Sequence, residues 1–292
     1  MTSSETDRRI GVIGLGLMGT AIVERLLVSG YVPVVWNRTR NKANPLIERG
    51  AVWSDRPVSE CDRVIVSLFS SDVVSEVLTP WQSDIRAGQI IIDTTTGDPQ
   101  HSMAWERQLA ALGATYLDAP ISGSSETTRR GEATVIVSGD RAAFAACGDL
   151  WPVLGKIVFH VGSCGSAAKV KLVSNLVLGL NRAALAEGLV FAESLGLDSR
   201  TTLEVLKGSA AYSRQMDTKG VKMIESDFTV QAKLSQHLKD VRLILQSAAE
   251  NGLSLSLSQA HRQLLEQAES LGLGELDNSA IIQAARRKAN SG

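Results

Sequence analysis

A glycine-rich turn between an apolar run and a helical segment is the most restrictive feature of the sequence. Ile10–Ile13 is a short run of strand-forming residues, and it ends in Gly14-Leu15-Gly16-Leu17-Met18-Gly19. Apolar residues then recur at helical spacing until Gly30, which is expected to end the helix. A second β-branched run, Val32–Trp36, follows. The order of strand, turn, helix and strand predicts a dinucleotide-binding unit.

The three glycines have separate duties in such a unit. Gly14 permits the tight turn, Gly16 lets the backbone approach a pyrophosphate, and Gly19 lets the helix pack on the strand. The turn residues, including Leu15, Leu17 and Met18, then present backbone N–H groups and the positive end of the helix dipole to the phosphates. The alternative is a strand-to-helix turn that binds nothing.

The end of the second strand predicts which dinucleotide is bound. NAD sites place an acidic residue there to bind the ribose 2′-hydroxyl, whereas an arginine accommodates the 2′-phosphate of NADP. The chain has Asn37-Arg38-Thr39 and no carboxylate at this position. A guanidinium forms charge-assisted, forked hydrogen bonds with phosphate oxygens. We therefore expect NADP to be favoured over NAD; the alternative is that Arg38 is an ordinary surface arginine.

Strand-like runs alternate with helical segments as far as residue 160. The runs are Arg63–Leu68, Gln89–Asp93, Thr115–Asp118, Ala133–Val137 and Lys156–His160. This alternation predicts a mostly parallel sheet covered on both faces. Because ligands bind outside the carboxyl ends of such strands, the rule selects Leu68, Phe69, Thr94–Thr96 and Asp118–Ser124.

Ser122-Gly123-Ser124 is the most informative of these segments. It offers two hydroxyls and flexible backbone N–H groups directly after a strand. Such a turn can hold an anion, including a substrate carboxylate. The alternative is an ordinary serine–glycine loop. The polar stretch that follows, Glu126–Gly131, is expected to be an exposed loop.

The pattern changes near Gly162, where the strand-like runs stop. Residues 166–195 can form one helix of about 45 Å, apolar around much of its circumference and so expected to be buried on several sides. Further helices are predicted from Thr201 towards Lys207 and over Ala232–Asn251, Ser258–Ser270 and Asn278–Ala289. The sequence predicts a Rossmann-type α/β domain over residues 1–162 and an all-α domain over residues 163–292, joined by the long helix.

Lys171 and Asn175 lie four residues apart near the start of the long helix, and Ser174 shares their face. The helix dipole and partial burial both disfavour an ammonium group there. Both effects are expected to lower the pKa of Lys171 towards the range in which a lysine exchanges protons near neutral pH. The alternative is a solvated surface lysine.

Composition argues against several other functions. A net charge of −1 without a basic run argues against nucleic acid as the partner. The polar residues Met1–Arg8 lack the apolar core of a signal peptide, and no uninterrupted apolar run approaches the roughly 18 residues of a membrane span. Three dispersed cysteines and four scattered histidines predict a reduced, cytoplasmic location and no metal site.

Four segments together resemble the β-hydroxyacid dehydrogenase family, which includes 3-hydroxyisobutyrate dehydrogenase, tartronate semialdehyde reductase and glyoxylate or succinic semialdehyde reductases. They are Gly14–Gly19, Asp118–Gly123 (DAPISG), Gly162–Asn175 (GSCGSAAKVKLVSN) and Lys239-Asp240. They occur in the family's order and at its spacing, so the resemblance covers nearly the whole chain.

The resemblance implies an NADP(H)-dependent oxidoreductase that interconverts a small β-hydroxy acid and the corresponding semialdehyde or keto acid. Lys171 would be the general acid/base, and Asn175 would hold the substrate beside it. The remaining implied contacts are Ser122, Gly123 and Ser124 with the substrate carboxylate, Leu68, Phe69 and Thr96 with the ribose and nicotinamide end of the cofactor, and Lys239 with the nicotinamide or the substrate acid. Family members usually form dimers or tetramers through the helical domain.

A few positions depart from the family pattern. Ser124 stands where a second glycine is usual, Ser174 where Asn or His is common, Ala167 where a glycine is common, and Phe69 where a proline follows the strand. Because Ser124 and Ser174 flank the expected substrate, a substrate other than hydroxyisobutyrate stays open. Two further alternatives are an imine reductase, a class that usually lacks a lysine at the position of Lys171, and a dinucleotide-binding interaction protein without turnover.

Overall fold

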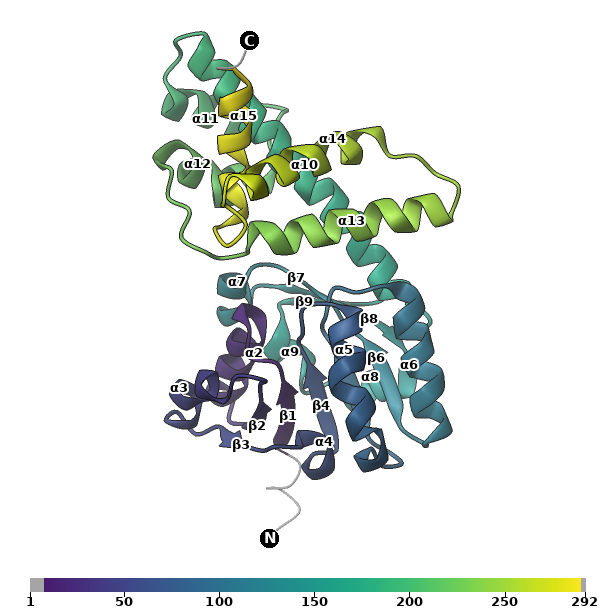
Figure 1. Ribbon diagram of the computed structural model, residues 1–292. Coiled ribbons are helices and arrows are strands. Elements are labelled where there is room, and N and C mark those ends of the chain that lie inside the picture. The colour runs from purple at the N-terminus through teal and green to yellow at the C-terminus, as the bar shows by residue number, and fades with distance from the viewer. Residues whose placement is uncertain (1–7, 290–292) are drawn as a thin grey trace. The chain divides into compact units, whose positions relative to one another are not determined.

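The computed structural model describes residues 8–289 (Figure 1). The chain divides into two compact units, Met1–Lys171 and Leu172–Gly292. The division falls inside the long helix, whereas the sequence predicts a domain boundary near Gly162. The N-terminal unit contains a β-sheet with helices on both faces, and the C-terminal unit is helical. The predicted fold class, a Rossmann-type α/β domain followed by an all-α domain with a long connecting helix, is confirmed.

The strands of the N-terminal unit form one sheet in the order β3-β2-β1-β4-β5-β6-β8-β7, with β9 beside β8. Neighbours from β3 to β6 are parallel, and the order 3-2-1-4-5-6 is that of dinucleotide-binding sheets. The strands are β1 (Arg9–Ile13), β2 (Val32–Trp36), β3 (Val52–Trp53), β4 (Arg63–Val66), β5 (Ile90–Asp93), β6 (Thr115–Asp118), β7 (Ile121–Ser122), β8 (Thr134–Gly139) and β9 (Ile157–His160).

The sheet is mostly parallel, as predicted, but strand β8 runs antiparallel to both β6 and β7. The chain returns from β6 through β7 and the short helix α7 (Ser125–Arg129) in place of a full crossover helix, and a parallel connection needs a longer crossover. Residues 126–129, predicted to be part of an exposed loop, therefore lie in a helix. Ser124 caps this helix by accepting a hydrogen bond from Thr127 N.

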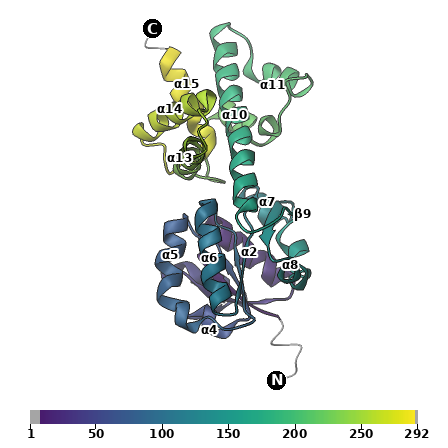
Figure 2. The same cartoon turned by 90° about the vertical axis from the view of Figure 1, so that its right-hand side faces the viewer.

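Helices cover both faces of the sheet (Figure 2), and side chains of the central strands alternate between the two apolar layers beneath them. Ile65 and Ile92 belong to the layer formed with α2 and α9, whereas Val64 and Ile91 belong to the layer formed with α5 and α6. The period of two in a pleated strand produces this division. The helices of the first layer are α2 (Leu17–Val28), α3 (Asn44–Ile47), α8 (Arg141–Ala146) and α9 (Trp151–Leu154); those of the second are α4 (Pro57–Glu60), α5 (Ser71–Leu78) and α6 (Pro99–Ala111).

Helix α10 (Ser166–Ser194) is the predicted long helix, but it is not buried on all sides. Val173, Val177 and Phe191 are each more than half exposed along one face of the helix, whereas Arg182 is fully buried. By length and composition α10 could cross a membrane, yet 44% of its most apolar window is buried inside the fold. Its burial and its internal Arg182 are those of a core helix in a folded protein.

The C-terminal unit is built from helices that pack around one apolar core. After α10 they are α11 (Ser199–Lys207), the π-helical turn η3 (Met216–Gly220), α12 (Val221–Glu225), α13 (Leu234–Glu250), α14 (Ser256–Ser270), the 3₁₀ turn η4 (Asn278–Ala280) and α15 (Ile281–Ala289). Helices α13 and α14 lie side by side (Figure 1). The four helices predicted beyond residue 195 are confirmed, with ends displaced by one or two residues and the last one opening as a 3₁₀ turn.

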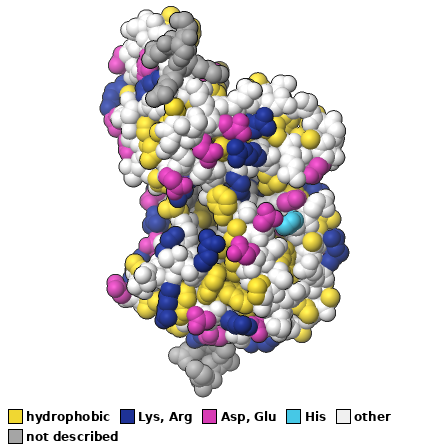
Figure 3. Space-filling model, in the orientation of Figure 1, with side chains coloured by type: hydrophobic (Ala, Val, Ile, Leu, Met, Phe, Trp, Pro, Cys, Tyr) yellow, Lys and Arg dark blue, Asp and Glu magenta, His cyan; other side chains and the backbone are white. Residues whose placement is uncertain are grey.

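Charged side chains of both signs are interspersed on the molecular face drawn in Figure 3. This distribution agrees with the near-zero net charge of the sequence. A strong field of one sign, which nucleic-acid-binding surfaces use, needs charges of that sign to be clustered.

Candidate functional site

The turn between β1 and α2 can be built only with glycine at two of its positions. Gly14 has φ +100°, and a Cβ atom there would lie 2.2 Å from the carbonyl oxygen of Ser67. A Cβ atom at Gly19 would lie 1.9 Å from the carbonyl oxygen of Gly14. At Gly16, in contrast, a Cβ atom would meet nothing within 4 Å. The turn is therefore packed tightly against the protein at Gly14 and Gly19. It is open at Gly16, where the pyrophosphate of a ligand could approach the backbone.

Hydrogen bonds fix the orientation of this turn. Gly14 N donates to Trp36 O over 2.8 Å, and Leu15 N donates to Asn37 Oδ1 over 2.9 Å. Asn37 also donates from Nδ2 to Thr39 O. No side chain of the described residues caps α2, so the N–H groups of its first turn face the open side with the positive end of the helix dipole. These donors fit the pyrophosphate of a dinucleotide.

The end of β2 presents a guanidinium to solvent. The side chain of Arg38 is 82% exposed, and its nearest carboxylate oxygen, on Glu76, is 4.0 Å away. An exposed pair at this distance contributes little to stability, so Arg38 can turn to another anion at small cost. The side chain of Asn37 is hydrogen-bonded to Leu15 N and Thr39 O, and Thr39 is exposed. The surroundings suit the 2′-phosphate that the sequence predicts here.

The loops after β4 and β5 come together beside the glycine turn. A Cβ atom on Gly14 would lie 2.9 Å from Leu68 Cδ2, and Leu68 N donates to Thr95 Oγ1 over 3.1 Å. Phe69 is half exposed and Thr96 is partly buried. The structure thus places the residues predicted to contact the ribose and nicotinamide end, Leu68, Phe69 and Thr96, on adjoining loops at the carboxyl edge of the sheet.

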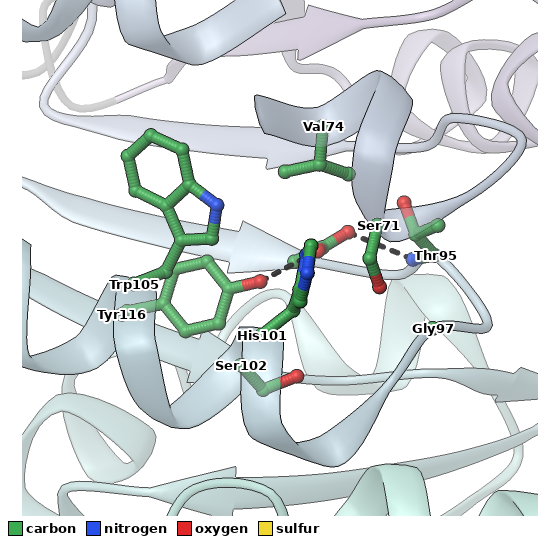
Figure 4. A pocket seen from close by; sticks show the side chains of 9 residues that line it. Ser71, Val74, Thr95, Gly97, His101, Ser102, Trp105 and Tyr116 are labelled. Carbon is green, nitrogen blue, oxygen red and sulfur yellow. Dashed lines mark hydrogen bonds between the residues drawn. The ribbon is translucent and has the colours of Figure 1, made fainter. Parts of the chain in front are cut away.

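Residues that line a small polar pocket fix the loop after β5 by hydrogen bonds (Figure 4). Tyr116 Oη donates to Asp93 Oδ2 over 2.6 Å, and Thr95 N donates to Asp93 Oδ1 over 2.9 Å. Asp98 N donates to Ser71 Oγ on the neighbouring helix α5. Burial and the adjacent Asp93 carboxylate raise the pKa of Tyr116 well above its usual value, so the phenol remains a hydrogen-bond donor.

The segment Ser122-Gly123-Ser124 is more ordered than a flexible anion-binding turn. Ser122 ends β7, and the Ser124 hydroxyl accepts from Thr127 N at the start of α7. A Cβ atom at Gly123 would lie 2.6 Å from Thr127 Oγ1, so a side chain there would require Thr127 to shift. Of the two predicted hydroxyl contacts, Ser124 therefore serves the cap of a short helix, and Ser122 is partly exposed at the end of its strand.

Helix α10 carries the predicted catalytic pair in buried positions. Lys171 and Asn175 are each 6% exposed and are one helical turn apart. In the C-terminal unit, Asn175 Nδ2 donates to Asp240 Oδ2 over 2.9 Å, and Lys239 Nζ lies 2.9 Å from Asp240 Oδ1. Because an ionised carboxylate only accepts hydrogen bonds, Asp240 fixes the amide nitrogen of Asn175 towards itself. The amide oxygen is then turned the other way, as an acceptor.

Sequence reasoning did not identify the role of Asp240. It sits in the Lys239-Asp240 pair that carries the resemblance, but the sequence has no pattern that links it to Asn175, 65 residues earlier. In the sequence Thr95 is one of three consecutive threonines after a strand, with nothing to distinguish it from its neighbours. Its hydroxyl holds Leu68 N, a contact that spans 27 residues.

Two family models match consecutive parts of the chain. Residues 9–162 match the NAD-binding domain of 6-phosphogluconate dehydrogenase, and residues 165–285 match the NAD-binding region of NADP-dependent 3-hydroxyisobutyrate dehydrogenase. Glyoxylate/succinic semialdehyde reductase 1 of Arabidopsis thaliana is 33% identical over 283 residues, which cover 95% of this chain and 98% of that protein. The chain belongs to the β-hydroxyacid dehydrogenase family.

Two further comparisons describe the range of proteins to which this family member is similar. The structure of 3-hydroxyisobutyrate dehydrogenase from Salmonella typhimurium superposes with a TM-score of 0.87 at 24% identity, covering 94% of this chain and 99% of that one, which supports the fold. Human cytokine-like nuclear factor N-PAC is 30% identical over 285 residues, 96% of this chain but only 52% of that protein. The chain thus spans about half the length of N-PAC. In this chain the β1–α2 turn lies within residues 9–162, the part that matches the NAD-binding domain model.

Proposed function

We propose that this β-hydroxyacid dehydrogenase family member is an NADP(H)-dependent enzyme that interconverts a small β-hydroxy acid and the corresponding semialdehyde or keto acid. The observation that carries the proposal is the buried Lys171, one turn before Asn175, on the helix that follows the dinucleotide-binding domain. The name of the Arabidopsis relative, a glyoxylate/succinic semialdehyde reductase, supports a small aldehyde acid as the substrate.

The residues that would hold the cofactor are those of the β1–α2 turn and the end of β2. The N–H groups of the first turn of α2 would bind the pyrophosphate, and Arg38 would bind the 2′-phosphate. The bound nicotinamide supplies hydride chemistry at its C4 atom. Leu68, Phe69 and Thr96 would lie along its ribose and nicotinamide.

Lys171 is the general acid or base in the proposed reaction. As an ammonium it donates a proton to the alkoxide oxygen that develops when a carbonyl is reduced; as a neutral amine it removes the hydroxyl proton in the opposite direction. Asn175, oriented by Asp240, presents its amide oxygen to the substrate hydroxyl or to the lysine. Ser122, the Gly123 backbone and Lys239 would bind the substrate carboxylate, with Ser124 shaping that loop through its cap on α7.

A substrate screen tests the proposal. NADPH oxidation is measured with glyoxylate, succinic semialdehyde, tartronate semialdehyde and methylmalonate semialdehyde, with NADH in parallel. We expect turnover with at least one of these acids and a preference for NADPH. If NADPH binds but no acid is reduced, the dinucleotide-binding role suggested by the N-PAC similarity replaces the enzymatic one.

Arg38→Asp is expected to weaken NADPH binding by about tenfold to a hundredfold, because a charge-assisted hydrogen bond contributes about 1.5–3 kcal/mol. NADH binding should change little. Dissociation constants from fluorescence titration check this. Arg107→Asp, the same charge change on the exposed side of α6, is the matched control. A variant at Arg38 that still prefers NADPH contradicts the cofactor assignment.

We also propose that the protein forms a homodimer or homotetramer through the exposed apolar face of α10. Val173 and Val177 lie one turn apart on this face and are 64% and 51% exposed, and an apolar face of this kind favours burial against a second copy. The double variant Val173→Glu/Val177→Glu is expected to be monomeric by sedimentation velocity. Val205→Glu, at an equally exposed valine of α11, should keep the wild-type mass; an oligomer that survives the double substitution refutes this interface.

A reduced compartment such as the cytoplasm is the proposed location. Cys61, Cys147 and Cys164 are all free and buried. Burial raises the pKa of the Cys61 thiol to about 11, which keeps it protonated and unreactive.

A further inference from the structure

Glu76, on helix α5, is the acidic neighbour of Arg38. Its Oε1 lies 4.0 Å from Arg38 Nη1, and the two side chains are 65% and 82% exposed. An NAD site has an acidic residue at the end of its second strand, and this chain has none at residues 37–39. The structure supplies a carboxylate to the same place from a different element of the chain.

Apolar contacts hold the end of β2 beside the end of α5. Trp36, the last residue of β2, and Trp81, in the 3₁₀ turn η2 (Thr79–Asp84) that directly follows α5, form an edge-to-face pair with ring centroids 4.8 Å apart. Val77, next to Glu76 in the chain, packs against the same apolar layer as Trp36. The charged side chains of Arg38 and Glu76 therefore start from neighbouring backbone positions that the core keeps in place, although both side chains end in solvent.

The Glu76 carboxylate affects the two pyridine nucleotides differently. A 2′-phosphate on Arg38 would compete with Glu76 for the guanidinium and would also be repelled by the carboxylate, so both effects weaken NADPH binding. Two unit charges about 4 Å apart in water alter an equilibrium constant about fivefold, and a phosphate monoester carries more than one negative charge near neutral pH. The ribose 2′-hydroxyl of NADH, in contrast, is neutral and can donate a hydrogen bond to a carboxylate.

We propose that Glu76 is a specificity-determining residue for the cofactor. Its negative charge limits the preference for NADPH that Arg38 provides, so that the site also accepts NADH. This inference deepens the proposed function and rests on it for the place of the 2′-phosphate beside Arg38. It assigns to α5 a part in the choice between the two nucleotides, and it concerns binding alone, so its test needs no substrate.

Glu76→Gln tests the proposal, because it keeps the shape of the side chain and removes its charge. Dissociation constants of NADPH and NADH are measured by fluorescence titration of the full chain at low ionic strength. We expect the dissociation constant of NADPH to fall about threefold to tenfold, and that of NADH to stay the same or rise. Glu76→Lys, which reverses the charge, should lower the dissociation constant of NADPH further.

Salt and a matched variant separate an effect of charge from an effect of structure. In about 1 M salt the screening length is about 3 Å, so the difference between Glu76→Gln and the wild type should shrink; a changed packing of α5 would not be screened. Asp62→Asn also removes an exposed carboxylate, one that lies 2.9 Å from Arg86. Asp62 directly precedes β4, at the amino edge of the sheet, and this variant should leave both dissociation constants unchanged.

Comparison with Arg38→Asp distinguishes a failure of this inference from a failure of the cofactor assignment. If Arg38→Asp weakens NADPH binding but Glu76→Gln leaves the ratio of the two dissociation constants unchanged, the proposal for Glu76 fails alone. If neither variant changes the ratio, the 2′-phosphate is bound elsewhere and both fail. An equal gain in affinity for NADPH and NADH in Glu76→Gln also overturns the proposal, because the charge then acts on the part that the two nucleotides share.

Discussion

Lys171→Ala is expected to lower kcat at least about a hundredfold, in line with the contribution of a general acid or base. Without the amine, no other group of α10 at this turn can give a proton to the developing alkoxide, because Asn175 carries an amide that does not titrate. NADPH affinity should be retained, since the dinucleotide is held by the β1–α2 turn. Steady-state kinetics on the substrate found by screening, together with fluorescence titration of NADPH, check both parts.

Two variants make the test specific. Lys169→Ala removes a lysine two residues earlier that is exposed on α10, and kcat should stay near the wild-type value. Lys171→Arg retains a positive charge but cannot release its proton near neutral pH, so it should be nearly as slow as Lys171→Ala. Wild-type kcat in Lys171→Ala would show that another group is the acid.

Gly14→Ala should weaken dinucleotide binding and strongly destabilise the N-terminal unit. The φ of +100° at Gly14 costs any other residue about 1–2 kcal/mol. The added Cβ atom would also lie 2.2 Å from Ser67 O, an atom of the backbone that cannot rotate away. We expect a loss in unfolding free energy well above the backbone cost alone and a rise of at least about tenfold in the dissociation constant of NADPH, measured by urea denaturation and fluorescence titration.

Gly88 provides the matched control, because it has a φ of +81° and its Cβ position is empty to 4 Å. Gly88→Ala should cost only the backbone strain and leave NADPH affinity unchanged. Equal stability losses in the two variants, with unaltered binding in Gly14→Ala, would mean that the turn relaxes and that its packing against Ser67 is not required.

The first half of the fold is strongly encoded in local sequence. The runs at Ile10–Ile13 and Arg63–Leu68 are short, apolar and β-branched, and only a buried strand of a parallel sheet suits such residues. The glycines between β1 and α2 then specify the turn, because their φ and contact requirements admit nothing larger. Local pattern was therefore sufficient for the longer strands, the first crossover and the class of ligand, whereas β3 and β7, with two residues each, were not predicted.

Helix α7 and the exposed face of α10 have physical causes that local pattern cannot reveal. Helix α7 has five residues, too few for a helical period to be recognised. A serine such as Ser124 is common both at helix N-caps and in loops, so it does not distinguish the two. The long helix was expected to be buried on several sides, but the pattern did not show that Val173 and Val177 would lie on an exposed face. An apolar side chain is stabilised by removal from water, but the sequence does not show whether the same chain or another molecule covers it.

The contacts that shape the candidate site are the least predictable part. Asp118 reaches Ala168 across 50 residues, Ser138 reaches Ala167 across 29, and Asn175 reaches Asp240 across 65. No period connects such positions, since they meet only after the sheet and the helices have assembled. The motifs select the candidate site residues, whereas the residues that hydrogen-bond to them and hold them in place are found only in the three-dimensional arrangement.

The bond between Leu15 N and Asn37 Oδ1 has a consequence for how such proteins diverge. Aspartate has the same shape as asparagine and an oxygen in the same place, so Asn37→Asp retains the acceptor that anchors the turn. The same substitution brings a carboxylate to the strand end where ribose-binding acids stand. Asparagine and aspartate codons differ by a single base. If Arg38 binds the 2′-phosphate as proposed, one base change at Asn37 would thus set a ribose-binding acid beside it, while the turn keeps the bond from Leu15 N and loses the bond from Asn37 Nδ2 to Thr39 O.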